Sequence, residues 1–205
     1  MFNALALISI LIVMILLKTI VEILPSILAC LIRWKENINI EASVRLSRDR
    51  DFSAIAMLIP FCLVVFRFRI YNPDFLAKLP DTPRLWAVIG IFVGYVLIRK
   101  AASFLVHPRR LSQKTLTATE KSANTYFILL TLVLLLVGST CSFFGASLNA
   151  IRITSLWLSA LIYGLYIIRK MQIFASSCSI FAAFLYLCAL EILPTGILVV
   201  SDIIF

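Results

Sequence analysis

The sequence predicts an all-α bundle of about six membrane-spanning helices, and three properties of the chain support this fold class. Hydrophobic residues make up 62% of the 205 residues, whereas a soluble domain is about half apolar. Only 14% of the residues are charged, and the mean hydropathy is +1.04. The apolar residues occur in long runs, which is typical of an integral membrane protein. We therefore predict a single integral membrane domain over residues 1–205, embedded in the lipid bilayer.

Six apolar runs are candidate spans, because a helix of about 20 residues crosses the hydrocarbon core and satisfies its own backbone there. The runs cover residues 2–32, 52–66, 85–98, 125–144, 151–168 and 177–201. The first is longer than a simple span and contains Pro25. The second is short and contains Pro60, so it is either a span or a re-entrant segment, which would leave five spans. The third can continue to Leu105.

Basic residues between the runs predict the orientation of the chain. The segments that follow the first, third and fifth runs contain 13 Lys and Arg residues, whereas those on the other side contain five. The positive-inside rule places the more basic side in the cytoplasm, so both termini face outward. If residues 52–66 do not cross the membrane, everything after them is inverted.

The word Glu-Ile-Leu-Pro occurs inside two apolar runs, at residues 22–25 and 191–194. A carboxylate in the bilayer is costly unless it is paired, hydrated or protonated. Glu22 has Lys18 on the same helix face. Glu191 has no basic residue within one turn, so it needs a partner on another helix, water or a raised pKa.

Proline adds a second cost at both places, because Pro25 and Pro194 each leave a carbonyl group one turn earlier without its donor. Two interpretations remain open. Either Glu191 pairs with Arg or Lys elsewhere in the bundle on a kinked structural helix, or acid and bare carbonyl form a small cation or proton site. If the first and last runs cross in opposite directions, Glu22 and Glu191 lie at mirrored depths, as in an inverted repeat.

The third and fifth runs end alike, since residues 94–104 and 164–174 share Gly-x-x-x-Ile-Arg-Lys-x-x-x-Phe. Either an internal duplication or convergence at cytoplasmic helix ends explains this likeness. Bases near these ends are candidate contacts for lipid headgroups or a partner protein: Arg99, Lys100, Arg109, Arg110, Arg169 and Lys170. Gly90 and Gly94 form Gly-x-x-x-Gly, which favours close helix packing inside the bundle, or against a partner.

The sequence contains no catalytic constellation, so we expect a non-enzymatic protein that needs no cofactor or metal. His107 is the single histidine and cannot form a metal site alone. Five cysteines lie in or beside apolar runs without a Cys-x-x-Cys pair, and we expect them to act as small apolar residues. The net charge of +9 reflects topology and headgroup contact, not nucleic-acid binding, because the bases cluster between apolar runs.

Residues 184–194, FLYLCALEILP, resemble the closing signature of a family of uncharacterised multi-pass membrane proteins of Bacteroidota, domain-of-unknown-function family 4271. The residues that match are Tyr186, Leu187, Cys188, Glu191 and Pro194. Arg169 and Lys170 at the end of the preceding helix are also similar to it. The chain departs from the usual pattern by ending soon after the motif without a basic tail. The resemblance implies a bacterial inner-membrane location, and it transfers no catalytic or ligand residue.

These observations favour a subunit or scaffold of a cell-envelope membrane complex, in contact with a membrane-protein partner or a second copy. The alternative is a small ion- or proton-coupled transporter or channel that uses Glu191 and Glu22. A polar cavity that reaches Glu191 would favour the alternative, whereas dry packing around a Glu191–Arg pair would count against it. An enzyme acting on lipid would need an acid–base pair that the sequence does not contain.

Overall fold

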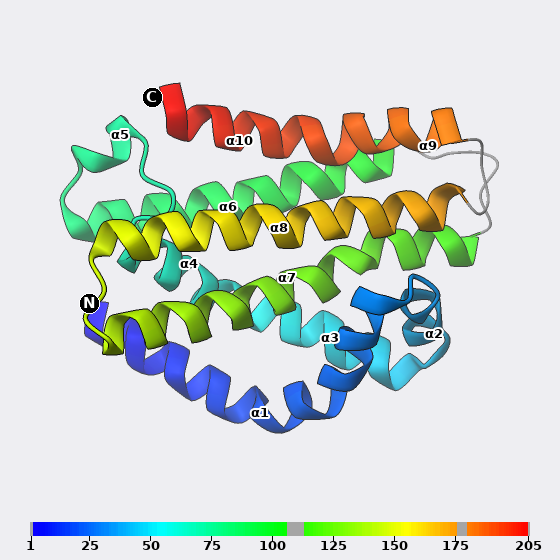
Figure 1. Ribbon diagram of the computed structural model, residues 1–205, viewed down its shortest axis with the longest axis horizontal. Helices are drawn as coiled ribbons and strands as arrows, with labels where there is room; N and C mark the ends of the chain where they lie inside the picture. The colour runs from blue at the N-terminus through cyan, green and yellow to red at the C-terminus, as the bar shows by residue number, and fades with distance from the viewer. Residues whose placement is uncertain (1, 106–112, 176–179, 205) are drawn as a thin grey trace.

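The computed structural model describes residues 2–105, 113–175 and 180–204, and its long helices lie roughly side by side (Figure 1). Five helical segments are long and apolar enough to cross a membrane. They are α1 (Phe2–Ile32), α6 (Asp81–Leu105), α7 (Gln113–Phe143), α8 (Leu148–Ala175), and a last segment made of α9 (Ile180–Leu187), the π-helix η1 (Cys188–Ile192) and α10 (Leu193–Ile204). The predicted membrane helix bundle is therefore confirmed, as are all the predicted spans except the second.

The second predicted span is broken in two. α3 (Val44–Ala56) ends and α4 (Leu58–Arg67) begins on either side of Met57. Pro60 explains the break, because its ring clashes with the carbonyl four residues earlier, that of Ala56. With 10 residues, α4 rises about 15 Å, which is half the thickness of the hydrocarbon core. α4 alone is therefore too short to span.

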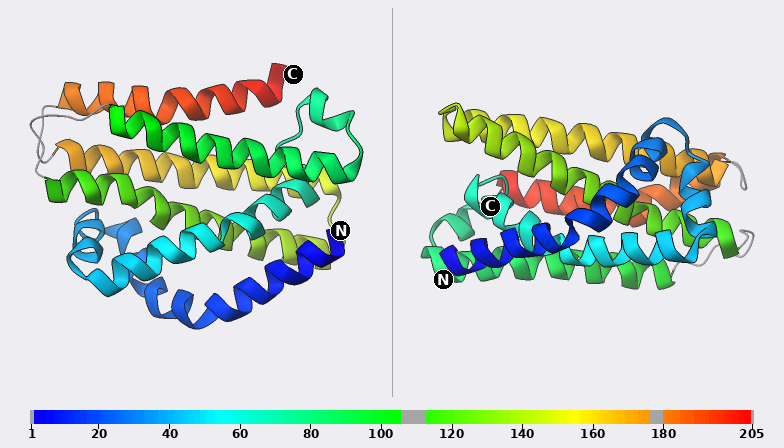
Figure 2. Two further views of the ribbon diagram at one scale, coloured as in Figure 1. Left: turned by 180° about the vertical axis from the view of Figure 1, so that it is seen from behind. Right: turned by 90° about the horizontal axis from the view of Figure 1, so that it is seen from below.

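The two short helices nevertheless follow one another along the length of the bundle. They run from the end that carries α2 (Glu36–Ala42) to the end that carries α5 (Asp74–Ala77), as Figures 1 and 2 show. This path returns the chain to the end where α1 began. The N- and C-termini lie toward the same end of the bundle (Figure 1), as the six-run topology requires.

The core is formed by three clusters of buried side chains, which meet at α7. One surrounds α4, where every residue from Phe61 to Val65 is buried. A second joins α1, α3, α7 and α8, and a third joins α1 to Met57. Phe127 of α7 packs against all three clusters. α7 is therefore the central helix, and α4 is apolar on every side because it is buried among its neighbours.

The glycines of α6 and α7 have opposite surroundings. A Cβ atom at Gly138 of α7 would lie 2.5 Å from Cε2 of Phe68, so this helix approach needs glycine. A Cβ atom at Gly90 or Gly94 would meet no atom of the described residues within 4 Å. The prediction that Gly90 and Gly94 pack inside the bundle is therefore wrong, because their face of α6 points outward. Packing against a partner stays a prediction.

The shared end of the two termini can be tested with fusion reporters. We expect a reporter that is active only outside the cytoplasm to give the same result at the N- and C-termini. The same reporter fused after Ala42 should give the opposite result, because α1 separates that point from the N-terminus. Opposite results at the two termini would show that α3 and α4 do not return the chain across the membrane.

Candidate functional site

The last helix widens at the motif that the sequence singled out. Residues Cys188–Ile192 form the π-helix η1, in which the N–H of Leu193 donates to the carbonyl of Cys188. Pro194 follows directly and supplies no N–H to the carbonyl of Leu190. The carbonyl of Glu191 accepts a hydrogen bond from the hydroxyl of Tyr163 on α8 at 3.0 Å. π-helical turns of this kind occur often at functional sites, so the local backbone marks Glu191.

The side chain of Glu191 is held between two cations from other helices. It is only 2% exposed and pairs with Lys170 of α8 and, at 2.8 Å, with Arg99 of α6. Both cations bind the same carboxylate oxygen, Oε1. The structure therefore places a basic pair from neighbouring helices around this acid, as the first of the two interpretations of Glu191 required.

A tyrosine completes this group of side chains, which we call the Glu191 cluster (Arg99, Tyr166, Lys170 and Glu191). The hydroxyl of Tyr166 accepts hydrogen bonds from Nη2 of Arg99 at 2.6 Å and from Nζ of Lys170 at 3.1 Å. The same two cations lie 5.7 Å and 5.5 Å from the centre of its ring, within the range of cation–π attraction. Sequence reasoning missed Tyr166, because a tyrosine inside an apolar helix carries no signal of its partners.

A second ionic cluster joins α2 and α3 to α7. Arg50 of α3 is 1% exposed and pairs with Glu41 of α2 and, at 2.8 Å, with Asp51. Lys121 of α7 pairs with Asp51 at 2.9 Å and with Glu41 at 3.5 Å. The acids and bases of this cluster are equal in number. These charges lie on the helices α2, α3 and α7 and join them.

The first Glu-Ile-Leu-Pro word has a different environment from the second. Glu22 pairs with Arg45 of α3 at 3.0 Å, and both side chains are exposed. The expected partner was Lys18, and this assignment is wrong because α3 returns beside α1 and brings Arg45 to Glu22. Lys18 is itself exposed. Pro25 lies inside the single helix α1, without the π-helix that precedes Pro194, so the two words are not structurally equivalent.

Comparison with known proteins assigns the chain to a family. The family model described as "Domain of unknown function (DUF4271)" matches residues 3–200. The chain belongs to the DUF4271 family. This match extends the resemblance from the C-terminal signature to nearly the whole chain. No curated protein and no solved structure matches the chain.

Three of the bases expected at the membrane surface point into this DUF4271 bundle. Arg99 and Lys170 belong to the Glu191 cluster, and Arg169 donates from Nε and Nη2 to the carbonyl of Leu31, at 3.0 Å and 2.6 Å. Arg169 therefore caps the C-terminal end of α1, where helix carbonyls lack donors. Lys100 is exposed, and Arg109 and Arg110 lie outside the described residues. A contact with headgroups or a partner does not fit the buried Lys170, whereas for Arg99, Lys100 and Arg169 it stays a prediction.

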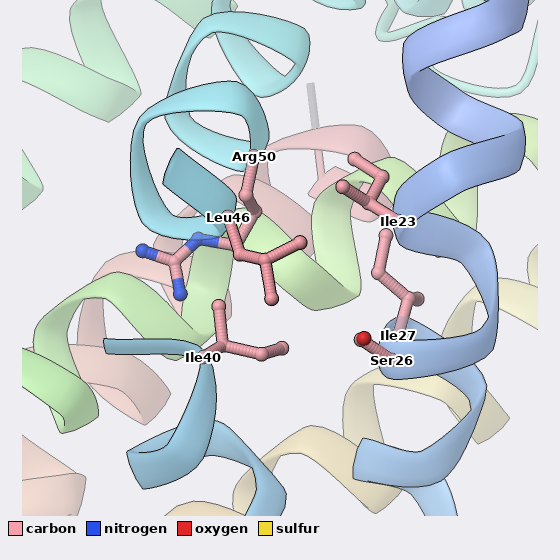
Figure 3. A pocket seen from close by; sticks show the side chains of 6 residues that line it. All are labelled: Ile23, Ser26, Ile27, Ile40, Leu46 and Arg50. Carbon is pink, nitrogen blue, oxygen red and sulfur yellow. The ribbon is translucent and has the colours of Figure 1, made fainter. Parts of the chain in front are cut away.

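The described residues of the DUF4271 chain enclose little free space. A crevice of about 180 Å³ lies between α1, α2 and α3, and it is too narrow for a water molecule. Its walls are mainly the aliphatic side chains Ile23, Ile27, Ile40 and Leu46, and the guanidinium of Arg50 points away from Ile23 and Ile27 (Figure 3). None of the Glu191 cluster lines it. Within the described part of the chain, no group of three or more metal-ligating side chains gathers.

Substitutions at Glu191 and at Lys170 should lower the free energy of unfolding by different amounts. Glu191→Gln leaves the buried Lys170 and the partly exposed Arg99 without a carboxylate, and we expect a loss of about 3–5 kcal/mol in the free energy of unfolding. Lys170→Met leaves the Arg99–Glu191 pair intact, and we expect a loss of about 1 kcal/mol. Reversible unfolding in detergent micelles measures both values.

Glu22→Gln is the matched control for these substitutions, because it removes an ion pair that is exposed. We expect it to cost at most about 1 kcal/mol. Equal losses for Glu191→Gln and Glu22→Gln would show that the Glu191 cluster does not stabilise the helix bundle.

Proposed function

We propose that this DUF4271 protein is a non-enzymatic subunit or scaffold of a membrane complex in the bacterial cell envelope. The observation that carries the proposal is the Glu191 cluster, in which the most buried acid of the bundle joins α6, α8 and η1. Its side chain is 3% exposed, and this burial fits a structural ion pair better than a hydrated site. Charges that lock helices together suit a rigid membrane scaffold better than a moving ion pathway.

The outer face of α6 supports the proposal of a membrane partner. Fewer residues are buried in α6 than in any of the other four candidate spans. Trp86, Val93 and Leu97 are exposed on this face, beside Gly90 and Gly94, which leave the helix backbone open to close approach. In a complex, a helix of a partner protein or of a second copy would cover this face.

The proposed location is the bacterial inner membrane, with both termini in the periplasm. The excess of basic residues in the segments after the first, third and fifth runs supports this orientation. The exposed Arg45 and Arg48 of α3 lie in one of these segments, where they suit contact with the anionic headgroups of the cytoplasmic leaflet.

Site-specific crosslinking tests the scaffold proposal. We expect a photo-crosslinking residue at Val93 or Leu97 of α6 to give a discrete, stoichiometric adduct in native membranes. Matched positions on the exposed face of α1, Leu11 and Met14, should give none, because that face carries no close-packing glycines. Light scattering should give a mass above the 23.0 kDa of one chain. A monomer without α6 adducts would contradict the proposal.

The second candidate is a small ion- or proton-coupled transporter or channel, and the π-helix at Glu191 is the observation that favours it. A π-helix is a place where a helix can change its hydrogen bonding, and two cations beside one carboxylate allow a proton to move within the cluster. The crevice between α1, α2 and α3 lies away from this cluster, which counts against a pathway.

Proton flux in liposomes separates the two candidates. We expect the purified protein to pass protons no faster than empty liposomes under an imposed pH gradient, because Glu191 is packed without a water-filled path. Folded Glu191→Gln protein should give the same background. Flux in the unmodified protein that is abolished by Glu191→Gln, with folding retained, would establish the transporter and overturn the scaffold.

A further inference from the structure

The Glu191 cluster has more positive than negative charge. Arg99 and Lys170 each pair with Glu191, so two cations share one carboxylate. Glu120 of α7 also attracts the charge of Lys170, but no ion pair within 4.0 Å joins them among the described residues. The ionic cluster around Arg50, in contrast, has as many acids as bases. Among the described residues, one positive charge of the Glu191 cluster therefore has no acid of its own to pair with.

The unbalanced charge is accessible at Arg99. Lys170 and Glu191 have side chains that are 3% exposed, whereas the side chain of Arg99 is 23% exposed. Arg99 binds both Glu191 and Tyr166 through Nη2 alone. Nε and Nη1 carry the remaining N–H donors of this partly exposed side chain, and such donors suit the oxygens of a phosphate group.

The surroundings of Arg99 are those of a lipid-facing helix end. Val96 and Ile98 of α6 are exposed, and so is Lys100. Arg99 lies about 27 Å along α6 from Asp81, at about 1.5 Å per residue, which is close to the ~30 Å thickness of the hydrocarbon core. The guanidinium group is thus at the depth where headgroup phosphates begin.

We propose that Arg99 and the exposed Lys100 bind the phosphate of an anionic phospholipid, and that the uncompensated charge of the Glu191 cluster drives this binding. The lipid supplies the missing negative charge, and its acyl chains lie along the exposed apolar residues of α6. A charge in a low-dielectric site attracts a counter-ion far more strongly than one in water. This inference goes beyond the scaffold role and does not require a protein partner.

The buried lysine provides the sharpest test, because Lys170 cannot touch a lipid and acts only through the charge balance. The experiment uses the full-length protein in nanodiscs that contain phosphatidylglycerol or phosphatidylcholine, with lipid retention measured by native mass spectrometry. We expect retention of phosphatidylglycerol over phosphatidylcholine in the unmodified protein. Lys170→Met should reduce this preference by about tenfold or more, because the remaining Arg99–Glu191 pair is neutral.

The matched control is Lys35→Met, which removes one positive charge from an exposed residue outside the cluster. It should change the preference less than about twofold, because an exposed charge is screened. If Lys170→Met fails to fold, Arg99→Gln replaces it, since this variant keeps the buried Lys170–Glu191 pair and should lose the preference equally. Melting curves and light scattering identify the folded variants.

Three outcomes would overturn the proposal. Equal retention of the two lipids by the unmodified protein would show that Arg99 binds no anionic lipid. An unchanged preference in the folded Lys170→Met or Arg99→Gln protein would show that the excess charge plays no part. Displacement of phosphatidylglycerol by millimolar inorganic phosphate would assign the site to free phosphate. None of these outcomes bears on the α6 crosslinks, so this inference and the scaffold proposal fail separately.

Discussion

The ion pairs of Glu191 are the interaction on which the arrangement of α6 depends. The first half of α6 packs against α4, whose buried residues surround Val88. The second half is joined to the rest of the bundle by polar contacts with the last helix: Arg99 with Glu191, and the hydroxyl of Tyr95 with that of Thr195 at 2.9 Å. In hydrocarbon, no hydrophobic driving force holds two helices together. Polar contacts and close packing must hold the helices together instead, and the second half of α6 depends mainly on polar contacts.

The last helix is held at two levels, which explains how it tolerates a π-helix in its middle. At one level Glu191 is fixed by α6 and α8. At the other, Asp202 accepts a hydrogen bond from the backbone N–H of Asn72 at 2.6 Å and lies 3.4 Å from Arg152. Tyr71 also bonds Ser201 at 2.7 Å. Glu191 lies inside the π-helix and Asp202 lies after it, so contacts with other helices hold both the widened turn and the helix that follows it.

The fold was largely predictable from the sequence, whereas the partners of the charged residues were not. Long apolar runs identify spans because the bilayer demands about 20 apolar residues, and Pro60 marked the broken one. The sequence predicts that Glu191 needs a partner from another helix, since no base lies within a turn of it. The partner of Glu22 was not, because periodicity along α1 shows Lys18 but gives no information on where α3 returns. Arg99 and Lys170 point into the bundle because of how the helices pack. The sequence of one span alone does not show this packing.

The repeated Ile-Arg-Lys ending shows how one short sequence serves two different contacts. Arg99 and Arg169 correspond in the repeat, as do Lys100 and Lys170, yet Glu191 pairs with Arg99 and Lys170, which do not correspond. Adjacent residues on a helix point about 100° apart. In this structure each of the two helices directs one of its consecutive bases to Glu191 and the other elsewhere. The remaining base of α6, Lys100, is exposed, and the remaining base of α8, Arg169, caps α1. Selection for that pair of directions explains the likeness of the two endings without a duplicated fold, because a duplication would place corresponding residues in corresponding contacts.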